Sequence, residues 1–148
     1  DTGSGLSNEL ISLSKIVDWT ILTLTPELTA ISDCYALYKW LLQSEPNVSA
    51  SLVINRAGGP DEAADIAERF ALLTSKFLDR KPYVVGYLSE SDMIREAVAR
   101  QRSLFADEPR VKSAAEFTRL AGRLSALSIS QSGAQRLSSL REEVNLKA

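Results

Sequence analysis

The sequence predicts an α/β fold in which a parallel sheet carries helices on both faces. Three short apolar runs, each suited to one strand, alternate with longer segments whose apolar residues recur every three or four positions. The strand runs are apolar throughout rather than alternating, which is typical of parallel strands buried on both faces. Together these two patterns indicate βαβ units, with the helices serving as crossover connections.

The first unit begins with a strand predicted at residues 19–24, a β-branched apolar run. A helix follows it, and we expect Thr25 to cap this helix and Pro26 to occupy its first turn. The helix should end before Pro46, because the residue before a proline avoids helical geometry. Its predicted apolar face consists of Leu28, Ile31, Tyr35, Tyr38 and Leu42.

The second unit repeats this order. A strand is predicted at residues 52–54, a turn at 57–60, and then a helix with negative charge near its start. The predicted apolar face of that helix consists of Ile66, Phe70, Leu73 and Phe77. A third strand is predicted at residues 83–87, and a further helix begins near Ser91.

The last part of the chain has a helical pattern. After Pro109, the stretch Ser113-Ala-Ala-Glu116 fits a capping box, in which each end residue satisfies a backbone N–H of the other. The buried stripe of this helix is predicted to be Phe117, Leu120, Leu124 and Leu127. We therefore expect one unit over residues 1–127, followed over 128–148 by a polar link and a short C-terminal helix.

Composition excludes several classes of function. The chain has 148 residues, 45% of them hydrophobic and 24% charged, as in ordinary globular proteins. It has no histidine, which rules out a Ser-His or Cys-His catalytic pair and makes a zinc site improbable. The net charge of -2 offers no broad attraction to DNA. Its single cysteine, Cys34, fits a core thiol in a reducing compartment, and we expect a cytoplasmic protein.

Chemistry-bearing residues lie at the predicted strand ends, where open parallel sheets bind ligands. Asp1 is followed by Gly3 and Gly5: an acid can hold the water shell of Mg²⁺, and glycines let backbone N–H groups approach a phosphate. The alternative for this stretch is a plain Gly-Ser turn. Asn55 and Arg56 follow the second strand, and the Asn amide can both donate to and accept from an adenine edge. The alternative there is a turn asparagine.

Taken together, four stretches resemble the MinD/ParA-type deviant Walker ATPases, most closely the flagellar-number regulators of the FlhG, FleN and YlxH type. Asp1-Thr-Gly-Ser-Gly-Leu-Ser7 resembles the Walker B and switch II segment of that family. The other three are a strand-to-helix passage, an adenine-binding strand end, and a last strand and helix, at residues 24–39, 52–56 and 85–98. The resemblance runs in the family's order over residues 1–127, and implies the C-terminal part of a P-loop NTPase-like sheet.

The resemblance implies roles for individual residues. Asp1 would be the Walker B acid, both catalytic and acting on Mg²⁺ through water, while Gly3 and Gly5 would offer backbone N–H groups to the phosphates. Asn55 would read adenine and Arg56 would flank the base. The loop beside the purine would consist of Ser89, Glu90 and Ser91, although many relatives have proline at the position of Ser89.

The resemblance also implies a function: an ATP- and Mg²⁺-dependent switch ATPase that regulates flagellar placement or number. It implies a homodimer in the ATP state and a protein partner. The alternatives are a ParA- or MinD-type partitioning or division-site ATPase, and a pseudo-ATPase scaffold that acts through protein binding. The sequence contains no Gly-rich, lysine-containing Walker A loop, and Gly58-Gly59-Pro60 does not replace one. We therefore expect the chain alone to be inactive and residues 19–24 to lack a neighbouring strand. No direct membrane anchor is evident, so membrane association would act through partners.

Overall fold

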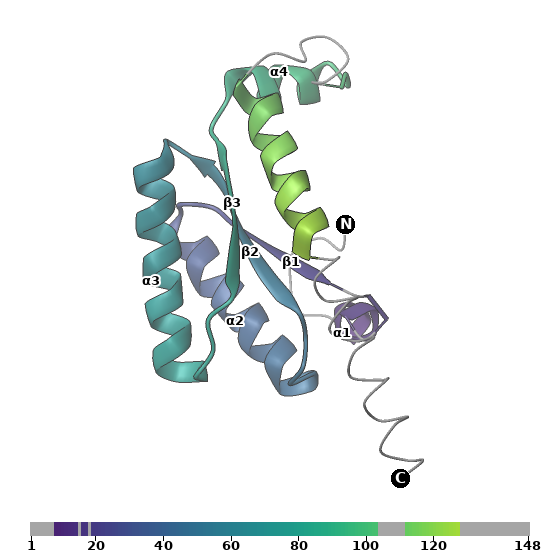
Figure 1. The fold of residues 1–148 in the computed structure, drawn as a ribbon, viewed down its shortest axis with the longest axis vertical. Helices are drawn as coiled ribbons and strands as arrows, with labels where there is room; N and C mark the ends of the chain where they lie inside the picture. The colour runs from purple at the N-terminus through teal and green to yellow at the C-terminus, as the bar shows by residue number, and fades with distance from the viewer. Residues whose placement is uncertain (1–7, 15, 18, 104–111, 128–148) are drawn as a thin grey trace.

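Three parallel strands form the sheet of this protein. The structure, a computed structural model, describes residues 8–14, 16–17, 19–103 and 112–127. The strands β1 (Thr20–Leu24), β2 (Ala50–Ala57) and β3 (Tyr83–Ser89) pair in the order β1-β2-β3 (Figure 1). Both pairings are parallel, so all three strands end at one edge of the sheet. The α/β prediction is confirmed, and within the described residues β1 pairs with β2.

Two helices cover one face of the sheet. They are α2 (Leu28–Ser44), which follows β1, and α3 (Pro60–Leu78), which follows β2 (Figure 1). Alternate residues of the strands point toward them and form the larger core with their inner faces. Its most deeply buried side chains are Leu24, Leu41, Leu52, Ile54 and Phe70.

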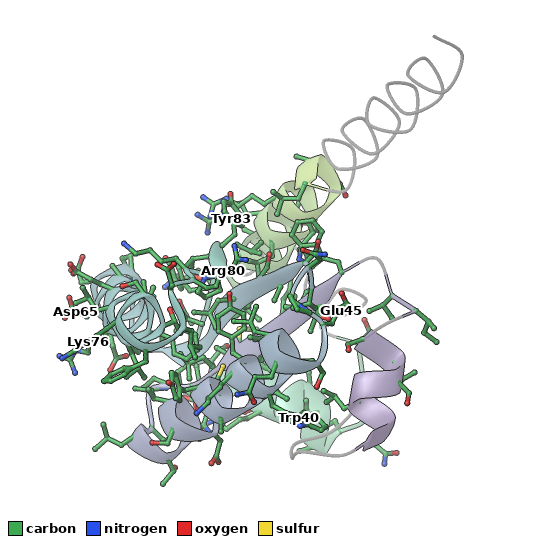
Figure 2. All side chains as sticks on the ribbon, turned by 90° about the horizontal axis from the view of Figure 1, so that it is seen from below. Trp40, Glu45, Asp65, Lys76, Arg80 and Tyr83 are labelled. Atoms are coloured by element: carbon green, nitrogen blue, oxygen red, sulfur yellow. The ribbon has the colours of Figure 1, made fainter. Side chains whose placement is uncertain are left out.

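A helix over residues 112–127 covers the other face and is drawn in green without a label in Figure 1. Viewed from below, the sheet lies between this helix and the pair α2 and α3 (Figure 2). Its Leu120 packs with Val53, Val85 and Leu88 in a second core, with Phe117, Leu124 and Leu127 against it, which confirms the predicted stripe. Gly86 allows the close approach, because a Cβ there would lie 2.8 Å from Leu120 Cδ2. Helices on both faces are therefore confirmed.

The predicted start of α2 is wrong. The helix begins at Leu28 with Glu27 as its N-cap residue, and no side chain caps it. The side chain of Thr25 hydrogen-bonds to Glu27 instead. The face is rotated accordingly: Leu28 is 78% exposed, and the buried residues are Cys34, Tyr38 and Leu41. Tertiary packing on β1, rather than the local cap, sets where this helix starts.

Elsewhere the helices agree with the sequence in part. In α3, negative charge in the first turn is confirmed, but Phe77 lies at the surface in the last turn beside Lys76 Nζ. The helix α4 (Asp92–Ala99) begins after Ser91 as predicted, and α1 (Asn8–Ser14), which was not predicted, adds Leu10 to the larger core. The polar link and the short C-terminal helix predicted over 128–148 fall outside the described residues. In the described part, no helix combines the length and apolar character needed to cross a bilayer.

The predicted capping box at Ser113 is also wrong. The chain is already helical at residue 112, so Ser113 lies inside the helix. The Glu116 carboxylate accepts two hydrogen bonds from Ser89 of β3. A tertiary contact therefore uses the carboxylate that the capping box would have placed on a backbone N–H of the same helix.

Candidate functional site

The described strand ends bring three polar positions together at one edge of the sheet. Glu27 follows β1, Arg56 lies near the end of β2, and Glu90 follows β3. Because β2 is the central strand, its end residue can reach both neighbours. This edge is where open parallel sheets bind ligands.

An irregularity in β2 shapes this edge. The register of β2 against β3 shifts between Ile54 and Ala57, and Arg56 adopts a left-handed conformation with φ 60°. Such a conformation costs a non-glycine residue about 1–2 kcal/mol. The side chain of Asn55 stabilises the turn, since its Oδ1 accepts a hydrogen bond from the Arg56 N–H at 3.0 Å. Backbone strain of this kind concentrates at functional sites, so the irregularity supports the assignment of a site here.

Arg56 bridges the acids that follow the two outer strands. Its Nε lies 2.7 Å from Glu90 Oε2, and its Nη1 lies 3.4 Å from Glu27 Oε1. Arg95 of α4 extends the network, with its Nε 3.2 Å from Glu90 Oε1 and its Nη2 2.6 Å from Asp92 Oδ1. Exposed ion pairs contribute only about 0–1 kcal/mol each to stability. The network therefore orients side chains more than it stabilises the fold.

Two groups of this network, Glu27 and Arg56, have pKa values shifted so that each keeps its charge. The pKa of Glu27 is lowered, first by the Thr25 side chain, then by its own backbone N–H and by Arg56. The pKa of Arg56 is raised, first by its hydrogen bond to Glu90. Ionised Glu27 and protonated Arg56 are therefore paired at neutral pH, and the lowered pKa of Glu27 keeps them paired at more acidic pH than an ordinary carboxyl would allow.

Asn55 retains hydrogen-bonding capacity at the same edge. Its side chain is partly exposed, and its amide nitrogen donates no hydrogen bond within the described part of the chain. Its Oδ1 has a second lone pair beyond the one that accepts from Arg56. The amide can therefore offer a donor and an acceptor side by side to a planar ring.

The three residues predicted to form one loop play different parts. Ser89 ends β3 and is buried, with its N–H and Oγ each 2.8 Å from an oxygen of Glu116. Glu90 belongs to the ion network, and Ser91 is the N-cap residue of α4. Glu90 and Ser91 have intermediate exposure and are accessible, whereas the buried Ser89 bonds to another part of the protein. A nucleotide contact by any of them stays a prediction.

Three participants were not identified from the sequence: Glu27, Arg95 and Glu116. Glu27 lies three residues after the predicted strand at 19–24, and that position near a strand end was a usable signal. Arg95 and Glu116 offered none, because their partners lie on other elements. Asp1, Gly3 and Gly5 lie outside the described residues, and the residues that the structure does describe hold no group of three or more acids or cysteines able to bind a metal.

Comparison with known proteins finds similarity over most of the chain. The chain is 27% identical over 124 residues to the antiactivator FleN of Pseudomonas aeruginosa, which covers 84% of this chain and 44% of FleN. The cell division ATPase MinD of Pyrococcus furiosus has a similar fold, with a TM-score of 0.63 and 21% identity over 86% of this chain and 50% of that one. No protein-family model matches. The chain thus spans half or less of the length of these relatives.

Proposed function

Because the chain is homologous to FleN and shares the fold of MinD, a deviant Walker ATPase of the MinD/ParA type, we propose that it forms the C-terminal half of an ATP-dependent switch. In this proposal the edge formed by Asn55, Arg56 and Glu90 receives the adenine end of ATP. The observation that carries it is the side chain of Asn55 at the end of the central strand, whose amide nitrogen donates to no residue that the structure describes.

The residues of this edge fit an adenine ring. Adenine presents a donor and an acceptor on one edge, and the Asn55 amide presents the complementary pair. Arg56 is held over the same edge by two acids, and a guanidinium stacks well on a planar base. Both residues are therefore assigned to base recognition.

The phosphate end is assigned to the residues before α1. Asp1 would hold Mg²⁺ through a water molecule, and the backbone N–H groups of Gly3 and Gly5 would bind phosphate oxygens. Bound Mg²⁺ would neutralise charge on the phosphates. The Walker A loop would come from another part of the ATPase domain, since the matched regions cover only 44% of FleN and 50% of MinD.

Nucleotide binding by the full-length protein tests the proposal. We expect wild type to bind ATP more tightly than GTP, and Asn55→Ala to reduce that preference about tenfold or more, since an unmet edge contact costs about 1–3 kcal/mol. The control is Asn47→Ala, the same substitution at an exposed position in the loop before β2, at the opposite edge of the sheet. Equal effects of the two variants would contradict the base assignment. A wild-type protein that binds no nucleotide would favour the scaffold alternative.

The biological role is proposed from the flagellar branch. FleN is named an antiactivator, and we propose that this protein likewise regulates flagellar number or placement, as a dimer in the ATP state with a protein partner and in the cytoplasm. Loss of the gene should change the number or position of flagella. Normal flagella with displaced division sites or lost plasmids would instead support the partitioning or division-site alternative.

A further inference from the structure

The most unusual contact outside the ion network is made by a buried acid. The Glu116 side chain is only 1% exposed, yet it lies on the helix that packs on the second face of the sheet. Its Oε2 accepts a hydrogen bond from the Ser89 backbone N–H and its Oε1 one from the Ser89 hydroxyl, both at 2.8 Å. Lys112 Nζ lies 3.7 Å from Oε1.

A buried carboxylate is not needed for packing. Removing a carboxylate from water is costly, and an apolar side chain of similar size often stabilises such a position as well or better. The two bonds from one residue do something else: they fix both the peptide plane and the side chain of Ser89. This fixes the point at which β3 ends.

The next residue belongs to the site. The Glu90 N–H donates to Ala57 O at 2.8 Å, and its carboxylate contacts Arg56 and Arg95. Glu90 is thus held by β2 on one side and, through Ser89, by Glu116 on the other. A shift of Ser89 would move the carboxylate that orients Arg56.

We infer that Glu116 is a positioning residue for base recognition, which acts through Ser89 and Glu90 to hold Arg56 in place. The inference rests on the proposed function for its ligand, an adenine nucleotide. It makes the helix over residues 112–127 part of the recognition apparatus, although none of its described side chains belongs to the ion network at the sheet edge.

The same helix supplies a matched control. Arg123 Nη1 donates to Val85 O at 2.6 Å, so this charged side chain also attaches the helix to β3. The attachment point, Val85, lies four residues before Ser89. Glu116→Leu removes both bonds to Ser89 and leaves an apolar side chain in their place. Arg123→Leu removes the bond to Val85. Glu116→Gln can still accept from the Ser89 N–H and donate to the Ser89 hydroxyl.

The test compares ATP and GTP binding by the full-length protein and these variants. We expect Glu116→Leu to reduce the preference for ATP about three- to tenfold, Glu116→Gln to keep it within about twofold, and Arg123→Leu to leave it unchanged at a comparable loss of thermal stability. Equal changes in preference for Glu116→Leu and Arg123→Leu, or none in either, would overturn the inference.

A second measurement needs no nucleotide. In hydrogen exchange, the Glu90 amide should exchange faster in Glu116→Leu than in wild type or Arg123→Leu, because its bond to Ala57 O then loses its support. An unchanged Glu90 amide would overturn the positioning step. A wild-type protein that binds no nucleotide would overturn the proposed function and the link to adenine, while exchange would still decide whether Glu116 positions Glu90.

Discussion

The thiol of Cys34 should be nearly inert in the folded protein. It is 7% exposed on the inner face of α2, and burial raises its pKa from 9.0 to about 12. The thiolate is the form that attacks alkylating and disulfide reagents. At pH 7.5 a rise of about three units lowers the thiolate population about 1000-fold, since each unit is a factor of ten. The chain has no other cysteine, so the reaction reports on this site alone.

The assay is the rate of reaction with a chromogenic disulfide reagent at pH 7.5, in buffer and in denaturing urea. We expect the reaction in buffer to be about 1000-fold slower than in urea, or to proceed at the rate at which the fold opens locally around Cys34. The Cys34→Ser variant serves as the blank. A rate in buffer within about tenfold of that in urea would refute the reasoning, because it would require an accessible thiolate.

The same pKa shift predicts how stability depends on pH. The folded state holds the Cys34 proton more tightly than the unfolded state does. The contribution to the free energy of unfolding is therefore fully present below pH 9.0 and falls as pH rises toward about 12. In urea titrations across this range, the free energy of unfolding of wild type should fall relative to that of Cys34→Ser as pH rises, and a constant difference would contradict the shift.

Phe70→Ala should lower the free energy of unfolding by about 3–5 kcal/mol, because its ring is fully buried beside Tyr38, whereas Phe77→Ala at the surface should cost less than about 1 kcal/mol. Denaturant titrations compare the two, and equal losses would contradict the burial. In the full-length protein, Asp1→Ala should lower turnover more than nucleotide affinity, and Asn55→Ala should do the reverse. Measurements of kcat and KM with ATP and GTP decide this, and identical profiles would remove the distinction. The 148-residue chain alone should hydrolyse no ATP beyond its Asp1→Ala control, because its sequence has no Walker A loop, and magnesium-dependent phosphate release above that control is the opposite result.

The sequence by itself determined the order and type of most elements. Strand runs such as Leu52–Ile54 are apolar throughout because both faces are covered, so periodicity identified them without knowledge of their partners. Order and spacing also carried the resemblance to MinD-type ATPases, now supported by the match to FleN and the likeness in fold to MinD. Asn55 could be chosen because a position after a predicted strand is a local property.

Only the tertiary structure decided which side chains meet. Glu116 is three residues from Ser113 in a sequence that fits a capping box, yet its carboxylate binds Ser89, 27 residues earlier in the chain. The left-handed Arg56 reaches acids that are 29 and 34 residues away. Local patterns encode periodicity and turns, whereas a hydrogen bond or ion pair requires two groups within about 3–4 Å, and that proximity arises only when the strands pair and the helices pack on them.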